Sequence, residues 1–429
     1  MKKTIFKDLL IFDGSEFFKG TVLSENGLVT SVSRNCHDSS DCDDCEVISG
    51  NYILTPGMIN LHTHIPMTLF KGVSEDLPLE KWLERIFPLE AKFISPEMVH
   101  ICGMWGMAEL LRSGVTSFAD MYFHEDFIGN AAKEINIKAV LGEGVINFPA
   151  PSGRSPEQTI EHTVELAEKH RNDPLISVAA APHSPYLTDE LYLLKLKEIS
   201  DKYSIPFHIH MAESQFEVTN YRNTHGKDEF ERFEELGLLC DRFIGAHCVN
   251  LTDRELEIMA RHKVTVAHCP SSNMKLGSGV ARVAEMLKME INVAVATDGS
   301  ASNNNLNLLE EAELAAKLQK VSKKDPTVFR SVEALKSVTS NPGKPLGKDR
   351  GVIKAGAPAD LVLIKTDSYE ISPVYDPASA LLYSSGHSDI KAVFVNGKKV
   401  VENGRILTID ENNLRKEFSR IVERVRREI

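Results

Sequence analysis

Hydrophobic and polar positions change their period along the chain, and this change divides it into regions. Residues 1–57 contain short apolar runs separated by Gly, Asn and Asp, a pattern typical of β-strands and turns. Similar runs return after residue 351, where the dipeptide Asn396-Gly397 marks a hairpin. We therefore predict one small β-sandwich built from both chain ends, residues 1–57 and 351–410.

The middle of the chain, residues 58–350, alternates strand-like and helix-like patterns. Eight apolar runs have the length of strands, and they read MINLHTH, GVTSFADMYF, KAVLGEGV, LISVAAAPHS, PFHIHMAES, FIGAHCV, VTVAHCP and NVAVATDGS. Alternation of apolar strands with helices favours an α/β fold with a parallel sheet, and eight strands favour a closed (β/α)8 TIM-type barrel. Residues 411–429 alternate Glu with Lys and Arg, which predicts a solvated amphipathic C-terminal helix.

Ionisable residues recur at the carboxyl ends of the predicted barrel strands. They are His62, His64, Asp120, His183, His210, Glu213, His247, His268 and Asp298. Histidines that serve only packing would be scattered over helices and both strand ends. Because barrel active sites assemble at the carboxyl ends of the strands, this recurrence predicts a functional site there.

The spacing of His62 and His64 fits ligation of one metal ion. Side chains alternate across a strand, so the two rings share a face and lie about 6.6 Å apart along it. His208 and His210 share a face by the same rule, and one of the two can ligate while the other packs. Asp298 ends the last strand, where a carboxylate can bind metal and accept a proton from water. Nitrogen and carboxylate ligands with an open position are typical of catalytic Zn²⁺, although Fe²⁺ accepts similar ligands.

The composition narrows the classes of partner. The 429 residues are 42% hydrophobic and 26% charged, which is typical of a globular enzyme with a large core. A net charge of −12, with acidic residues spread along the chain, disfavours nucleic acid and anionic membranes as partners. No window approaches the ~20 apolar residues of a membrane span, and the amino terminus lacks the pattern of a signal peptide. We therefore expect a cytoplasmic protein with a small-molecule substrate.

The seven cysteines, an odd number in a long chain, predict no disulfide framework. Cys36, Cys42 and Cys45 lie near His37 and offer the ligand types of a small zinc site. No second C-x-x-C or matched histidine pair follows at the required spacing. The surrounding Asp and Ser residues favour a hairpin loop instead.

Seven stretches, in order over nearly the whole chain, resemble the amidohydrolase-superfamily deaminases that act on 5′-methylthioadenosine, S-adenosylhomocysteine and 5′-deoxyadenosine. They are PGMINLHTH, FPLEAKF, APHSPY, HIHMAES, AHCVNLTD, AHCPSSNMKLGSG and TDGSASNNNLNLLEE. The resemblance is very specific for the superfamily. It is less specific for the substrate, because chlorohydrolases and other deaminases of the same branch share most of these stretches.

The resemblance implies one divalent metal, zinc in the first place and iron as the alternative, held by His62, His64, His210 and Asp298. It assigns proton transfer to Glu213, which follows His210. It places His247 beside the metal, where it polarises the hydrolytic water or the developing oxyanion. It also implies a homo-oligomer, a dimer or a tetramer.

The resemblance further implies that Glu90, Arg154 and His183 bind the substrate. Glu90 would bind the ribose hydroxyls. One departure concerns the end of the third strand, where some relatives carry an arginine and this chain has Glu143. The absence of that arginine favours substrates with a neutral 5′ group over S-adenosylhomocysteine.

Two alternatives stay open at this point. In the first alternative, the protein deaminates another amino-heterocycle, such as aminodeoxyfutalosine, guanine, cytosine or a triazine, or it is a chlorohydrolase of the same superfamily. From a different class, it can be a metal-binding scaffold without catalysis. The presence of Glu213 argues against the scaffold, because a scaffold does not need a residue that transfers protons.

Overall fold

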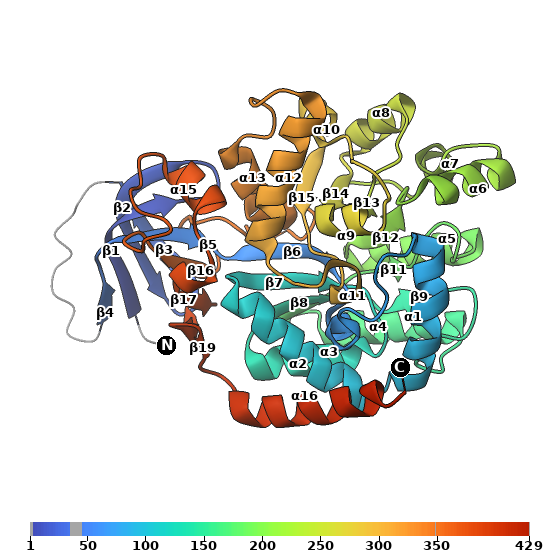
Figure 1. Cartoon of the computed structure of the whole chain (residues 1–429), viewed down its shortest axis with the longest axis horizontal. Helices are drawn as coiled ribbons and strands as arrows, with labels where there is room; N and C mark the ends of the chain where they lie inside the picture. The colour runs from blue at the N-terminus through green and yellow to red at the C-terminus, as the bar shows by residue number, and fades with distance from the viewer. Residues whose placement is uncertain (1–2, 35–44, 348, 429) are drawn as a thin grey trace.

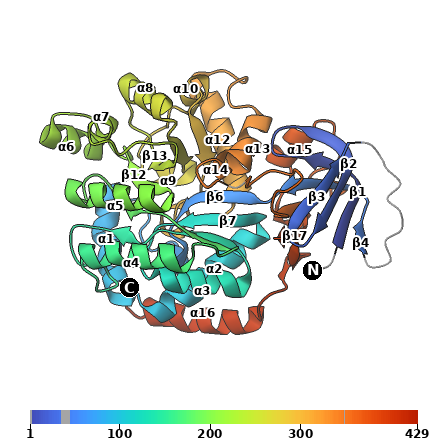
Figure 2. The same cartoon turned by 180° about the vertical axis from the view of Figure 1, so that it is seen from behind.

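The computed structural model describes residues 3–34, 45–347 and 349–428 and has a mixed α/β architecture. A sheet built from both chain ends lies at one end of the molecule, and parallel strands covered by helices make up the rest (Figures 1 and 2). The α/β fold class predicted from the sequence is confirmed. Most of the predicted hairpin loop around Cys36 and Cys42 lies outside the described residues. Cys45 is disulfide-bonded. An odd number of cysteines disfavours a framework of several bridges but does not exclude a single one.

The sheet at the chain ends has nine strands. They are β1 (Lys3–Phe12), β2 (Phe17–Glu25), β3 (Leu28–Ser33), β4 (Cys45–Ile48), β5 (Tyr52–Pro56), β16 (Leu361–Lys365), β17 (Ile390–Val395), β18 (Lys398–Glu402) and β19 (Arg405–Ile406). The two chain ends meet where β5 pairs with β16, and β5 also pairs with β1. The rings of Phe6 in β1 and Phe394 in β17 contact each other at 5.3 Å. Three strand spacings of about 4.8 Å would separate them in a flat sheet, so the sheet curls around its own core.

The parallel strands correspond to the eight apolar runs of the sequence. They are β6 (Met58–Thr63), β7 (Val115–Asp120), β8 (Lys138–Leu141) with β9 (Gly144–Val145), β10 (Ile176–Val178) with β11 (Ala181–Pro182), β12 (Phe207–Met211), β13 (Phe243–His247), β14 (Thr265–His268) and β15 (Asn292–Val295). Two four-stranded groups run in the orders β10-β8-β7-β6 and β12-β13-β14-β15. A parallel bridge between Ala180 and Phe207 joins them at one edge. At the other edge, the Asp298 amide donates to the His62 carbonyl at 3.1 Å.

Helices connect most of the parallel strands, and α15 and η2 lie between strands β16 and β17 of the sheet at the chain ends (Figure 1). They are η1 (Ile65–Phe70), α1 (Leu79–Phe93), α2 (Pro96–Arg112), α3 (Glu125–Ile135), α4 (Pro156–Lys169), α5 (Glu190–Tyr203), α6 (Gln215–His225), α7 (Glu229–Glu235), α8 (Asp253–His262), α9 (Pro270–Lys275), α10 (Val283–Lys288), α11 (Ser300–Asn303), α12 (Leu308–Lys323), α13 (Ser331–Val338), α14 (Ser340–Gly343), α15 (Pro377–Tyr383) and η2 (His387–Asp389). Capping boxes at Ser155, Ser214 and Thr252 fix the beginnings of α4, α6 and α8. These caps satisfy backbone donors that a helix leaves open.

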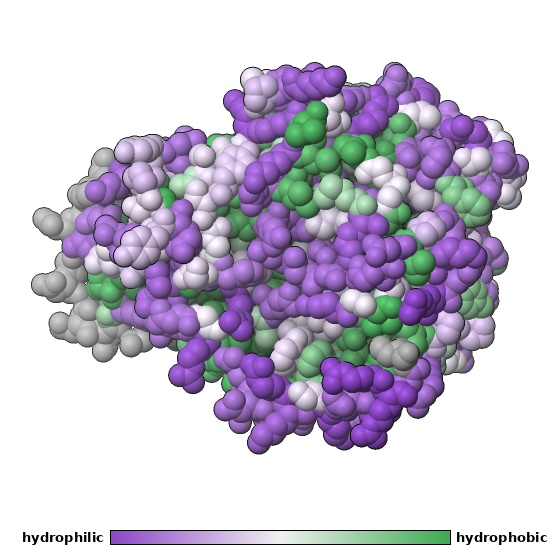
Figure 3. All heavy atoms as spheres, viewed as in Figure 1, coloured by the Kyte–Doolittle hydropathy of each residue, from purple (hydrophilic) through white to green (hydrophobic). Residues whose placement is uncertain are grey.

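The C-terminal helix α16 spans Glu411–Arg426, in the segment where the sequence predicts a solvated amphipathic helix. Its Leu414, Ile421 and Val425 are buried, and Phe418 stacks on Trp105 of α2 at 4.2 Å. Figure 3 shows mainly hydrophilic side chains along the lower edge of the molecule, where α16 lies. Within the described ranges, none of the helices has the length and apolar composition needed to span a membrane.

Candidate functional site

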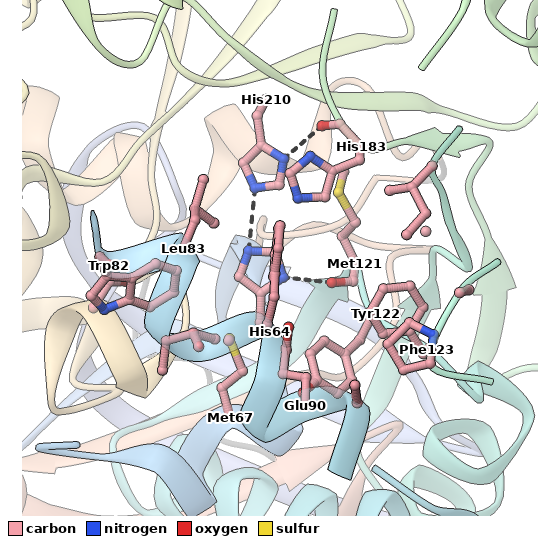
Figure 4. A pocket seen from close by; sticks show the side chains of 18 of the residues that line it. His64, Met67, Trp82, Leu83, Glu90, Met121, Tyr122, Phe123, His183 and His210 are labelled. Atoms are coloured by element: carbon pink, nitrogen blue, oxygen red, sulfur yellow. Dashed lines mark hydrogen bonds between the residues drawn. The ribbon is translucent and has the colours of Figure 1, made fainter. Parts of the chain in front are cut away.

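A cavity of about 490 Å³ opens at the carboxyl ends of the parallel strands (Figure 4). Seven of the residues predicted from the sequence line it: His64, Glu90, His183, His210, Glu213, His247 and Asp298. His62 is fully buried beside them. Arg154 does not line the cavity. Asp120, another strand-end residue, accepts a hydrogen bond from the Ile65 amide at 2.8 Å and serves the backbone.

Three histidines and one carboxylate converge beneath the cavity. His62, His64 and His210 bring one ring nitrogen each to within 4.8 Å of one another. The Oδ1 atom of Asp298 lies 3.3 Å from Nε2 of His64 and 3.5 Å from Nε2 of His62. The Nε2 atom of His62 is buried and has no hydrogen-bond partner among the described residues. A buried nitrogen without a partner fits a site that binds a cation.

Backbone carbonyls fix the tautomers of two of these histidines. The Nδ1 atom of His64 lies 2.5 Å from the Met121 carbonyl oxygen, and Nδ1 of His210 lies 2.6 Å from that of His183 (Figure 4). A carbonyl only accepts, so both Nδ1 atoms carry the proton. The two Nε2 atoms then face each other at 3.2 Å as lone pairs. This arrangement is repulsive without a cation between them, so the donor set fits a metal ion.

Burial keeps these rings neutral, as ligation requires. It lowers the pKa of His62 to about 4 and lowers the pKa of His64 and of His210 below the ordinary value for histidine. For Asp298, burial opposes ionisation. The neighbouring histidines outweigh it and hold the pKa of this carboxyl well below its usual range. Three neutral nitrogens and one carboxylate therefore face the site.

The loop after β15 holds Asp298 in a left-handed conformation, with φ of 62°. The Gly299 amide donates to Oδ1 at 2.7 Å. The hydroxyls of Ser272 and Ser302 donate to Oδ2 at 2.7 and 2.6 Å. These bonds fix Oδ2, so Oδ1 is the oxygen presented to the histidines.

A second layer of polar contacts holds that loop. Asn303 donates to the Thr297 carbonyl at 2.7 Å and to Glu311 at 3.0 Å. The carboxyl of Glu311, on α12, also accepts from the amide and the hydroxyl of Ser271. Glu311 therefore links α9, which follows β14, to α11, which follows β15. Burial raises the pKa of Glu311 to about 7, because its hydrogen bonds only partly offset the loss of hydration.

Replacing Glu311 with glutamine is expected to flatten the pH dependence of stability. A folded-state pKa near 7, above the ordinary 4.5, favours the folded state at low pH, and this contribution is lost between about pH 4.5 and 7. The difference in free energy of unfolding between pH 5 and pH 8 should shrink by up to about 3 kcal/mol, measured by urea unfolding. The exposed neighbour Glu310, replaced by glutamine, is the control. An unchanged difference in the Glu311 variant would contradict the raised pKa.

Glu213 and His247 face each other at the wall of the cavity. The Nε2 atom of His247 lies 3.6 Å from Oε2 of Glu213, and its Nδ1 atom lies 2.8 Å from Oδ1 of Asn273. Burial raises the pKa of Glu213 to about 7, partly opposed by His247. Burial alone would lower the pKa of His247, but the carboxylates of Glu213 and Asp298 outweigh it and raise this pKa. The pair can therefore exchange a proton with a bound molecule near neutral pH.

The opposite wall of the cavity is aromatic and carries one carboxyl. Glu90 points from α1 toward Tyr122, and burial raises its pKa to about 7, partly opposed by the Tyr122 hydroxyl (Figure 4). Trp82 and Phe87 of the same helix also line the cavity. His183 lies on the far side, where its ring contacts that of His210 at 4.6 Å. Flat apolar surfaces with few polar groups suit a heteroaromatic ligand that carries hydroxyls.

The side chain of Arg154 contacts Glu143 and does not line the cavity. Its guanidinium donates to Glu143 at 3.0 Å, and Glu143 also accepts from the amides of His124 and Glu125. The chain just before Arg154 does reach the cavity, through Phe148, Pro149, Ala150, Pro151 and Gly153. This part of the wall is therefore apolar, and the nearby positive charge is paired with Glu143.

The sequence did not reveal several residues that support the site. Ser272, Ser302 and Asn273 hold Asp298 and His247, and Tyr122 faces Glu90. The hydroxyls of PSSN and TDGSAS stand next to predicted site residues, and this adjacency was the available signal.

The comparison with known proteins agrees with this geometry. The sequence profile of the amidohydrolase family matches residues 53–400. The chain is 42% identical over 412 residues to the 5-methylthioadenosine/S-adenosylhomocysteine deaminase of Thermodesulfovibrio yellowstonii, covering 95% of this chain and 93% of that protein. It is 39% identical over 405 residues to the 5′-deoxyadenosine deaminase of Methanopyrus kandleri, covering 92% of each chain. This chain therefore belongs to the amidohydrolase family.

A solved structure supports the same assignment at the level of the fold. An adenosine deaminase from Xanthomonas campestris with bound zinc superposes with a TM-score of 0.94 at 31% identity. The match covers 99% of this chain and 98% of the other. The similarity thus extends over the sheet at the chain ends and over the region that carries the cavity.

Proposed function

We propose that this protein is a metal-dependent hydrolytic deaminase that converts a 5′-modified adenosine to the inosine analogue and ammonia. One observation carries the proposal. The cation-binding donor set, Glu213 with His247, and Glu90 on an aromatic wall all face a single cavity. The names of the two relatives at 39% and 42% identity support the same reaction class.

We propose zinc as the metal, with iron as the alternative. Three imidazole nitrogens and one carboxylate oxygen are ligands that catalytic zinc accepts, and the cavity leaves a position open for water. The zinc in the similar Xanthomonas campestris structure supports this choice. When bound, the metal supplies a water molecule of lowered pKa as the nucleophile.

The side chains divide the remaining chemistry. Glu213 delivers a proton to ring nitrogen N1, which makes C6 of the purine electrophilic. The water oxygen adds to C6 while Asp298 accepts the water proton. His247, whose raised pKa favours the imidazolium, donates from Nε2 to the oxygen that develops negative charge. As the C6–N bond breaks, Asp298 gives the proton it accepted to the leaving nitrogen, and the ionised Glu213 takes the proton of the new hydroxyl. Ammonia leaves and the 6-oxo product remains.

Glu90 and His183 are proposed to recognise the nucleoside. Glu90 is the acidic residue on the aromatic wall, where a carboxylate can accept hydrogen bonds from the two ribose hydroxyls. Its raised pKa makes binding of the ribose hydroxyls sensitive to pH near neutrality. His183, kept neutral by burial, offers a ring nitrogen to the substrate on the other side.

We further propose that the preferred 5′ substituents carry no charge. The segment before Arg154 lines the cavity with apolar side chains, and no Lys or Arg is among the described residues that line it. Arg154 itself pairs with the buried Glu143. A carboxylate on the substrate would therefore lack a cationic partner, which favours 5′-methylthioadenosine and 5′-deoxyadenosine over S-adenosylhomocysteine.

We also propose that residues 58–350 form a closed barrel and that residues 1–57 and 351–410 together form a β-sandwich. The bond between Asp298 and His62 and the Ala180–Phe207 bridge, at opposite edges of the two parallel groups, support closure of the barrel. The curled nine-stranded sheet supports the sandwich. The cytoplasmic location and the homo-oligomeric state stay predictions.

A substrate panel tests the function directly. Zinc-loaded protein is incubated with 5′-methylthioadenosine, 5′-deoxyadenosine, adenosine, S-adenosylhomocysteine, guanine and a chlorotriazine, and ammonia, chloride and ultraviolet absorbance are followed. We expect kcat/KM for the first two to exceed that for S-adenosylhomocysteine by about tenfold or more, the cost of one poorly compensated charge. Faster release of ammonia from guanine, or of chloride from the triazine, would contradict the proposed substrate class.

A further inference from the structure

His62 differs from the other two histidines of the donor set in the partner of its second nitrogen. Its Nδ1 atom lies 2.9 Å from Nε2 of His208, whereas those of His64 and His210 face backbone carbonyls. Both rings are fully buried and meet at an angle of 86°. A side chain thus orients His62, and unlike a carbonyl it can be removed by mutation.

An imidazole can donate or accept, so the single proton between His62 and His208 has two possible positions. If the proton sits on Nδ1 of His62, the Nε2 atom offers a lone pair to the cation site. If it sits on Nε2 of His208, His62 carries its own proton on Nε2 and cannot ligate. His62 can therefore bind the cation only when Nε2 of His208 accepts the hydrogen bond from Nδ1 of His62.

We propose that His208 is a positioning residue that holds His62 in the ligand tautomer. His208 must then carry its own proton on Nδ1, an atom that is buried and has no hydrogen-bond partner among the described residues. The geometry of β12 explains why its two histidines have different roles. His208 and His210 share a face, but His210 reaches His64 near the cavity while His208 meets the far side of His62.

The inference rests on the proposed metal site and is tested by zinc binding rather than by turnover. Zinc affinity is measured by equilibrium competition with a chromophoric chelator for wild type, His208→Leu and His208→Gln. Loss of the acceptor in His208→Leu should weaken zinc binding about 10–100-fold, the usual cost of removing a group that orients a ligand. Glutamine can place Oε1 near the position of Nε2, so His208→Gln should recover most of this loss.

His268→Leu is the matched control. His268 is also a buried histidine of a parallel strand, but no described residue bonds to either of its ring nitrogens. Its zinc affinity should stay at the wild-type value. Equal affinity of wild type and His208→Leu, or an equal loss in the leucine and glutamine variants, would overturn the inference.

Nitrogen NMR of histidine-labelled, zinc-loaded wild type provides a measurement that does not depend on the variants folding. We expect the His62 ring to be protonated at Nδ1 and His208 to be protonated at its own Nδ1. A proton on Nε2 of His208 would overturn the inference. Failure of the wild type to bind zinc would refute the proposed metal site itself, which distinguishes the two hypotheses.

Discussion

Replacing Glu213 with glutamine is expected to lower kcat by about 10²–10⁴-fold, the usual contribution of a general acid–base residue, while zinc content stays at the wild-type value. The carboxyl lines the cavity and faces His247, but its side chain belongs to none of the groups that converge on the cation site. Glutamine has nearly the same shape but cannot exchange a proton, so only proton transfer should be lost.

The measurement compares kcat with 5′-methylthioadenosine, zinc content by metal analysis, and thermal unfolding. Glu255→Gln is the matched control, because Glu255 is also a buried glutamate but lies on α8, outside the cavity. The control should retain near-normal kcat. A Glu213 variant that is zinc-loaded, folded and as active as the control would exclude Glu213 from proton transfer.

The location of the site was predictable because it depends on element type rather than on detailed packing. Parallel strands present their carboxyl ends at one edge, so His64 just after β6, His210 from β12 and Asp298 after β15 had to lie near each other. Alternation alone did not decide between His208 and His210, because it puts both on one face, and only the family resemblance selected His210. The structure separates them through their partners, His62 for the first and His64 for the second.

The direction of Arg154 was not predictable, because it depends on a tertiary contact. Local sequence places Arg154 just after an apolar segment and just before the capping box of α4, which allows the side chain several directions. Its partner Glu143 lies eleven residues earlier, between β8 and β9. Glu143 also accepts hydrogen bonds from two backbone amides at the beginning of α3. Spacing alone carries no information on such a pair.

The strand pairing in the sheet at the chain ends was likewise not predictable from local sequence. Alternating patterns identified the strands, but pairing of β5 with β16 joins segments about 300 residues apart and depends on long-range register. The curl that brings Phe6 onto Phe394 likewise follows from twist accumulated over several strands. Local periodicity therefore gave the strands, and tertiary contacts determined how they close.

Replacing Asp298 with asparagine is expected to reduce zinc affinity by about 100-fold or more, because even residues that only orient ligands contribute 10–100-fold. Asparagine keeps the shape of the side chain and can still accept from the Gly299 amide. The hydroxyls of Ser272 and Ser302, which donate to Oδ2, can rotate to accept from the new amide. The variant should therefore fold, and the loss should reflect the missing negative charge.

Saturating zinc separates the two roles of Asp298. If it only binds metal, kcat of the asparagine variant returns to the wild-type value at high zinc. If it also accepts the water proton, kcat stays about 10²–10⁴-fold low when the site is full. We expect the second result. Ser302→Ala is the control, because it removes only one hydrogen bond to Oδ2. It should lower kcat by only about tenfold. Full zinc binding and near-normal kcat in the Asp298 variant would remove both roles, because its neutral side chain offers neither a charged ligand nor a base.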